Sequence, residues 1–177
     1  MEKTEFYSKY LGSFKNPELA EGAEMWKILT KFPTYFAVPA AIHHHSNYTG
    51  GLFAHSLEVT KYLEVYTIGL DLKWERPDSP YFVGMLHDLC KLDDYFYYGE
   101  EWVYNEFAQA GHGEKSVFIA EQAGIELTEE EKACIRYHMG AFTDKEFWSS
   151  YSGSIHDFSN VLYTHTADMA ATHISEV

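Results

Sequence analysis

The sequence predicts an all-α fold that is interrupted by one short aromatic β-hairpin. Apolar residues recur at helical spacing over much of the 177 residues, whereas this period fails between Asp93 and Gly111. Hydrophobic residues make up 46% of the chain and aromatic residues 17%, so a sizeable core is expected despite a net charge of −14. This length and the absence of any internal repeat or linker predict one domain over residues 1–177.

The first three helices are expected over residues 16–31, 52–68 and 79–91. The first and third have proline in the first turn, where its missing N–H is tolerated, and the second shows an apolar stripe and ends at a glycine. Residues 33–51 are expected to form an irregular loop because they contain two prolines, three consecutive histidines and a glycine pair.

The break in helical periodicity predicts the hairpin. Residues 95–98 and 101–104 are short aromatic runs, and Gly99–Glu100 between them supplies a two-residue turn.

Three more helices are expected in the C-terminal half, over residues 113–123, 128–139 and 159–175. The second of them opens on a Thr-x-x-Glu capping box. Between it and the last helix, the Ser- and Gly-containing stretch over residues 143–157 is expected to be a loop.

Composition argues against several classes of protein. With 13 basic and 27 acidic residues, the chain lacks the positive charge that holds long nucleic acid. The longest apolar run, Phe36–Ile42, contains Pro39 and is far shorter than the ~20 residues of a membrane span, and the N-terminus has no signal-like block. Cys90 and Cys134 are the only cysteines. They are expected to be small buried hydrophobes in a reducing, cytoplasmic protein.

The third helix carries the first candidate for chemistry, an adjacent His87 and Asp88. An ionised carboxylate is almost never buried without a partner, and these two residues lie among apolar neighbours. Lys91 follows Asp88 by three residues and therefore projects over the same side of the helix. Taken alone, a surface Asp–Lys pair beside a core histidine explains this pattern better than a site does.

Other elements change that balance, because each offers one further group. His55 lies in the first turn of the second helix, and His112 lies between two glycines at the entry to the fourth. His138 lies near the end of the fifth helix, and Asp168 lies among small apolar residues of the last. Each has a structural explanation by itself, but five helices that each supply such a group favour a shared site.

In this order, the residues resemble the HD-domain superfamily of metal-dependent phosphohydrolases. His55, the His87–Asp88 doublet and Asp168 match the four ligands that define the superfamily. His112 and His138 match the two extra histidines of its dinuclear branch.

The neighbouring segments are similar to those of short, stand-alone HD proteins of bacteria and their phages. The resemblance covers residues 40–174 and implies an HD-type helical bundle with a metal-binding core over this range. Residues 1–35 would then form an N-terminal helical extension. The aromatic hairpin is not part of the minimal HD pattern.

The resemblance implies two divalent ions, and imidazole and carboxylate ligands suit Mn, Fe, Co, Ni or Zn. Asp88 would bridge the two ions; His55, His87 and Asp168 would complete one site, and His112 and His138 the other. A bridging water would act as the nucleophile. Lys91, the second catalytic candidate beside Asp88, would neutralise a phosphate oxygen. The implied activity is that of a phosphomonoesterase or phosphodiesterase acting on a nucleotide or another small phosphate ester.

Four residues are candidates for substrate binding: Lys91, His45 and Tyr48 in the loop before the second helix, and Lys115. Tyr48 is equally well explained as a packed loop aromatic, and Lys115 as a solvated helix residue. Near Asp168, His165 either supports the candidate ligands from behind or is a core residue, and we favour the core. Thr164 either orients the Asp168 carboxylate or is an ordinary helix hydroxyl.

Two other functions remain open from the sequence. A related branch that includes myo-inositol oxygenase uses a similar ligand set around two irons. Alternatively, the chain is a non-catalytic, nucleotide-binding HD module. The expected partner in the first reading is a small phosphorylated substrate, without long nucleic acid or a membrane; the oligomeric state and the identity of the metals are left open.

Overall fold

The computed structural model describes residues 3–42 and 47–175, and these are mostly helical with one small antiparallel sheet, as predicted. The α-helices are α1 (Lys3–Lys9), α2 (Pro17–Gly22), α3 (Met25–Leu29), α4 (Gly51–Leu70), α5 (Ser79–Leu86), α6 (Lys91–Asp94), α7 (His112–Gln122), α8 (Glu129–Arg136), α9 (Trp148–Asp157) and α10 (Asn160–His173). Three 3₁₀ turns are η1 (Leu11–Ser13), η2 (Gly140–Phe142) and η3 (Lys145–Phe147). None of the helices formed by the described residues has the length and hydropathy of a transmembrane segment.

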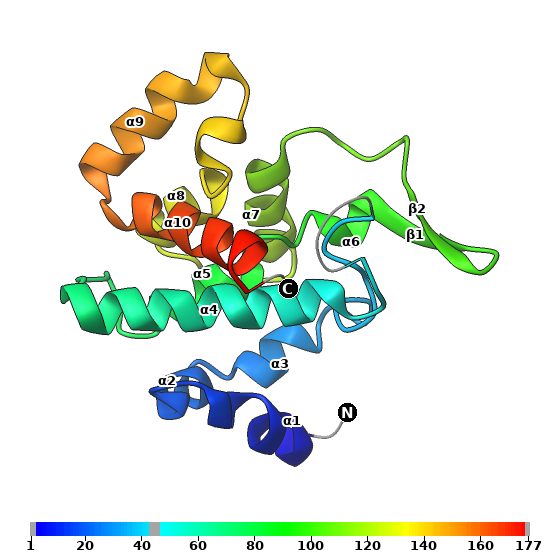
Figure 1. Cartoon of the computed structure of the whole chain (residues 1–177), viewed down its shortest axis with the longest axis horizontal. Helices are drawn as coiled ribbons and strands as arrows, with labels where there is room; N and C mark the ends of the chain where they lie inside the picture. Colours follow the sequence, from blue (N-terminus) through cyan, green and yellow to red (C-terminus); the bar gives the residue numbers. More distant parts are fainter. Residues whose placement is uncertain (1–2, 43–46, 176–177) are drawn as a thin grey trace.

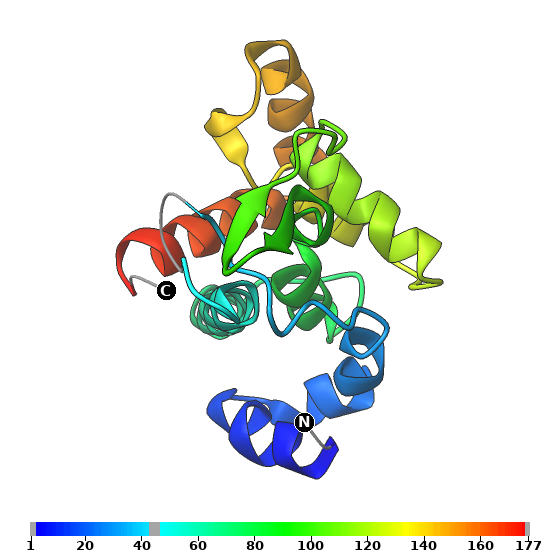
Figure 2. The ribbon, with the colours of Figure 1, turned by 90° about the vertical axis from the view of Figure 1, so that its right-hand side faces the viewer.

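Helix α4 forms the middle layer of the molecule. The N-terminal helices α1–α3 lie on one side of it, and α5 and α10 pack on the other (Figures 1 and 2). Aromatic packing joins the N-terminal layer to α4, because Tyr10 makes an edge-on ring contact with Phe53 at 4.6 Å between centroids. The described part of this segment, residues 3–35, thus extends the hydrophobic core rather than forming a core of its own.

A buried carboxylate also ties the N-terminal layer to the centre. Glu64 of α4 is 3% exposed and accepts hydrogen bonds from the backbone N–H groups of Lys15 (2.9 Å) and Asn16 (3.0 Å). The hydroxyl of Tyr81 on α5 donates to the same carboxylate. Three donors from two separate segments offset the cost of burying this charge.

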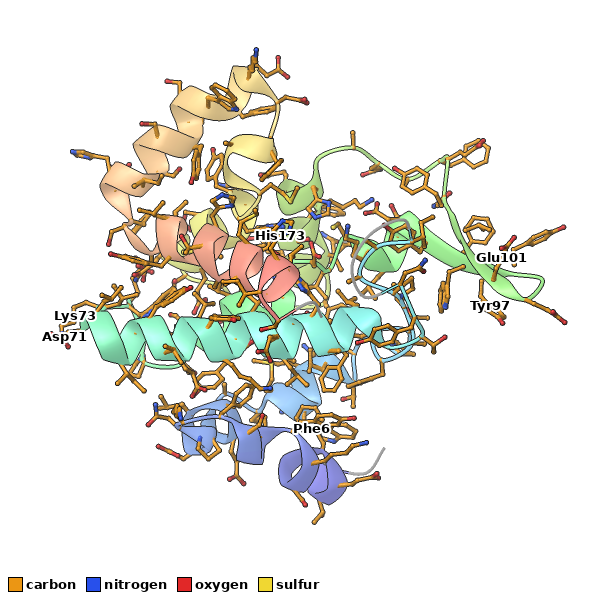
Figure 3. All side chains as sticks on the ribbon, in the orientation of Figure 1. Phe6, Asp71, Lys73, Tyr97, Glu101 and His173 are labelled. Carbon is orange, nitrogen blue, oxygen red and sulfur yellow. The ribbon has the colours of Figure 1, made fainter. Side chains whose placement is uncertain are left out.

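The predicted hairpin is confirmed as β1 (Tyr95–Tyr98) paired with β2 (Glu101–Tyr104). Gly99 has φ of +66°, which fits the first central position of a two-residue hairpin turn. Figure 3 shows Tyr97 and Glu101 on this hairpin, which projects from the helical bundle. Its attachment includes a hydrogen bond from the indole of Trp102 to the hydroxyl of Thr49 at 3.5 Å.

Three helix predictions are wrong in detail. The helix expected over residues 16–31 is split into α2 and α3, because Glu24 adopts a left-handed conformation with φ of +52°. The third helix stops at Leu86, after which Leu89 and Lys91 donate to carbonyls three residues back, so the chain tightens at His87–Asp88. The fifth helix, expected to reach Met139, ends at Arg136, although its capping box between Thr128 and Glu131 is confirmed.

The loop expected over residues 143–157 is also wrong, since most of it forms η3 and α9. Tyr151 and Ile155 lie one helical turn apart and pack against the core, so tertiary contact outweighs the low helix propensity of the neighbouring serines and glycine. Helix α10 agrees with the prediction to within two residues at each end.

A glycine permits the close packing of α4 on α5. A Cβ atom at Gly84 would lie 2.3 Å from Oγ1 of Thr60 and 2.7 Å from its Cα, so no other residue fits without displacement of α5. The carbonyl of Gly84 also binds the ring of His87, which links this packing to the candidate site.

We therefore expect Gly84→Ala to lower the free energy of unfolding by about 1–3 kcal/mol, because a methyl group forced into a packed helix contact strains both helices. The matched control is Gly153→Ala in α9, where no described atom lies within 4 Å of the added Cβ. This control should leave stability unchanged or raise it by up to about 1 kcal/mol. Urea unfolding of both variants tests the prediction, and equal stability of the two would contradict it.

Candidate metal centre

The fold brings together the six predicted ligands from different elements. They come from α4 (His55), the turn after α5 (His87 and Asp88), the start of α7 (His112), the turn after α8 (His138) and α10 (Asp168). Within each of three subsets, all donor atoms lie within 4.8 Å of one another: His55, His87 and Asp88; Asp88, His112 and His138; His87, His138 and Asp168.

One half of the cluster is formed around His55. Its Nε2 atom lies 3.1 Å from Oδ1 of Asp168 and 3.4 Å from Nε2 of His87. His55 and His87 are almost fully buried, whereas the Asp168 side chain is 14% exposed. This half is therefore open only on the side of α10.

Asp88 belongs to both halves. Its Oδ1 atom lies 2.7 Å from Nε2 of His112 and 3.4 Å from Nε2 of His138, and the same residue groups with His55 and His87 on the other side. A carboxylate in this position is the residue expected to be shared between two ions.

Backbone carbonyls orient two of the imidazoles. Nδ1 of His87 donates to the carbonyl of Gly84 at 2.9 Å, and Nδ1 of His138 donates to the carbonyl of Ile135 at 2.7 Å. Because a carbonyl only accepts, each Nδ1 carries the proton and each Nε2 faces the cluster with a donor lone pair. Histidines that bind metal ions commonly donate their other ring N–H to a carbonyl or carboxylate, which fixes the orientation of the ring.

The charges of the cluster also suit a cation. Burial lowers the pKa of His87 to about 4, so this imidazole is neutral at pH 7. Burial alone would raise the pKa of Asp88, but Lys91 and His112 hold it well below its ordinary value. Burial opposes ionisation of Asp168 as well, and the hydrogen bond from His55 lowers its pKa. Both carboxylates are therefore ionised.

One atom of the cluster is left unsatisfied. Nε2 of His138 is buried and has no hydrogen-bond partner among the described residues, although Asp88 Oδ1 lies 3.4 Å away without hydrogen-bond geometry. Burial lowers the pKa of His138, but the adjacent Asp88 carboxylate outweighs this effect and raises it. A lone pair facing a carboxylate oxygen needs a proton or a metal ion between them. The residues therefore fit divalent cations with imidazole and carboxylate ligands.

A cavity of about 540 Å³ opens on the cluster and is lined by Asp88, His112 and Asp168. Lys91 also lines this cavity. Burial lowers the pKa of its ammonium, but the nearby Asp88 carboxylate raises that pKa by more, so Lys91 stays charged. The remaining wall is largely apolar, with residues such as Met139, Phe142 and Met169. His173 on α10, labelled in Figure 3, is exposed at the cavity.

Two of the other substrate-binding candidates, Lys115 and Tyr48, do not line this cavity. The Lys115 ammonium is bonded to Asp93 (2.9 Å) and Asp94 (2.6 Å), so it holds α6 against α7 instead of facing a substrate. Tyr48 is 50% exposed and lines a separate cavity beside α1, α3 and the start of α4. His45 lies outside the described residues.

His165 has a role that the sequence analysis did not favour. Instead of being a core residue, it is partly buried, and its Nδ1 donates to the carbonyl of His138 at 2.8 Å. Its ring packs on Gly140, where a Cβ atom would lie 2.7 Å from the ring. Its position three residues before Asp168, on the same helix face, was the available signal. Thr164 is an ordinary helix hydroxyl that donates to the carbonyl of Asn160.

Comparison of the chain with protein-family models, with curated proteins and with solved structures found no match in any of the three. The geometry of the cluster is therefore the basis of the functional argument.

The neutral state of His87 predicts how stability depends on pH in the metal-free protein. Its pKa is about 4 in the folded state and 6.5 ordinarily, so the unfolded chain binds more protons between these values. The free energy of unfolding should therefore fall as the pH is lowered from 6.5 to 4, and His87 contributes a slope approaching about 1.4 kcal/mol per pH unit. His112, whose pKa is also lowered by burial, adds to this slope. His138, whose pKa is raised, titrates above this range.

Urea unfolding in the presence of a chelator, at a series of pH values, measures this slope. His87→Asn keeps a donor for the Gly84 carbonyl but removes the titrating group, so its slope over the same range should be shallower. Identical slopes for the two proteins would show that His87 does not titrate as described.

Proposed function

We propose that the protein is a metal-dependent phosphohydrolase of the HD type that acts on a small phosphate ester. The observation that carries this proposal is the position of Asp88, which is common to two groups of ligands and can therefore hold two divalent ions side by side. The resemblance in ligand order over residues 40–174 supports the same conclusion.

Two bound ions would polarise a phosphoryl oxygen and lower the pKa of a water molecule toward neutrality. Asp88 would fix their separation, while His55, His87 and Asp168 would hold one ion and His112 and His138 the other. The carbonyls of Gly84 and Ile135 keep the rings of His87 and His138 oriented before any ion arrives. Little reorganisation is therefore needed on binding.

Lys91 would bind the substrate phosphate. Its ammonium lines the cavity beside Asp88 and stays protonated, so it offers a localised positive charge to a phosphate oxygen. This explains how a chain with a net charge of −14 can accept an anionic substrate. The positive charge that binds the phosphate need only be local.

The shared position of Asp88 predicts the metal content of two variants. Asp88→Ala should lose both ions because it removes a ligand from each site, whereas His138→Ala should lose mainly one. Elemental analysis of protein purified without added metal measures both. Asp157→Ala and His156→Ala alter exposed residues of α9 and should keep the full metal content. Full retention by Asp88→Ala would refute the shared position.

Hydrolysis itself is tested with an aryl phosphate and an aryl phosphodiester in the presence of Mn²⁺, Co²⁺ or Ni²⁺. We expect turnover that a chelator abolishes and that Lys91→Ala lowers by about 10²-fold or more, because the cavity then lacks its fixed cation. Lys91→Arg should recover part of the activity.

Two results would contradict hydrolysis and indicate a different function. Purification with two irons and a mixed-valent signal in electron paramagnetic resonance would indicate an oxygenase instead. Tight binding of nucleotides without turnover, across all added metals, would indicate a binding module.

A further inference from the structure

A second cavity adjoins the candidate metal centre. Its volume is about 500 Å³, and it shares His112 and Met139 with the first cavity. Because Nε2 of His112 faces Asp88 at 2.7 Å, this ring forms part of the boundary between the proposed reaction site and the second cavity. A ligand that is bound beside Asp88 would reach the second cavity by passing His112 and Met139.

One stretch of chain supplies an aromatic ring to each cavity. Phe142 at the end of η2 lines the first cavity, and Phe147 at the end of η3 lines the second. Phe142 is 68% exposed and Phe147 is 46% exposed. Since neither ring is buried in the core, both have apolar surface that a ligand can cover.

The rest of the second cavity is firmly built. Gly113 at the start of α7 packs on the end of α8, since a Cβ atom there would lie 2.2 Å from the carbonyl oxygen of Arg136. Phe147 also lines this cavity, and its backbone N–H donates to the carbonyl of Asp144 at 2.9 Å. These two parts of the wall are thus held in place by packing and by a backbone hydrogen bond.

The two cavities differ in charge. Arg136 and Glu114, which both line the second cavity, form an ion pair, so their charges cancel. Among the described residues that line the first cavity, Lys91 alone carries a permanent positive charge. The first cavity therefore suits one phosphoryl group rather than a chain of phosphates, and the second suits an uncharged group.

From these features we propose that the substrate is a monophosphate ester of an uncharged ring system, such as an aryl or heteroaryl group. The phosphoryl group lies beside Asp88 and Lys91, and the ring lies in the second cavity against Phe147 and Met139. Phe147 is thus a specificity-determining residue. This inference rests on the proposed function, because it requires a phosphate at the metal centre.

Phosphonates, which are not hydrolysed, test the inference without turnover. Isothermal titration of the metal-loaded protein should show that phenylphosphonate binds about tenfold more tightly than methylphosphonate, which lacks the ring. Phe147→Ala should reduce this preference to less than about threefold while leaving the affinity for methylphosphonate unchanged. Phe147→Tyr, which keeps the ring, should retain the preference.

The matched control is Phe118→Ala on α7, which removes a ring of similar exposure that lines neither cavity. It should bind both phosphonates as the unaltered protein does. Equal affinity of the unaltered protein for the two phosphonates would overturn the inference and leave the proposed function standing. Binding of neither phosphonate by protein that holds its metals would overturn both.

Discussion

The burial of an ionised Asp88 between helices is the interaction on which the rest of the structure depends. Asp88 is 6% exposed, and its charge is costly to remove from water without compensation. Compensation comes from Lys91, which follows in the same stretch of chain, and from His112 on α7, because both favour the charged form. The fold must therefore bring α7 beside the turn that carries Asp88. The packing that stabilises this buried charge also assembles the candidate ligands.

Gly84 contributes both to the packing of α5 on α4 and to the geometry of the candidate ligands. The missing side chain lets α5 approach Thr60 of α4, and the same residue's carbonyl orients His87. Because α4 also carries His55, the approach of the two helices sets the 3.4 Å separation of the two imidazoles. His165 on α10 likewise links packing to a candidate ligand. It donates to the carbonyl of His138, and its ring packs on Gly140.

Local signals in the sequence were sufficient for some elements and not for others. The hairpin and the capping box at Thr128 depend on neighbouring residues, and the structure has both where they were predicted. Helix α9 depends on contacts of Tyr151 with distant parts of the chain, which its serine-containing sequence does not reveal. The order of the residues was enough to suggest the candidate ligands, which the fold brings together, but the pairing of Lys115 with Asp94 required the fold. An ammonium near a site in sequence can be engaged elsewhere in space.

The hairpin is structurally separate from the candidate metal centre. A two-stranded ribbon has little stability of its own, and cross-strand ring pairs such as Tyr97 with Trp102 hold this one together. Its Gly99–Glu100 tip is exposed, and none of the six ligands comes from the ribbon. Limited proteolysis would accordingly cleave the chain first at this tip, and the nicked protein would keep all six candidate ligands in place.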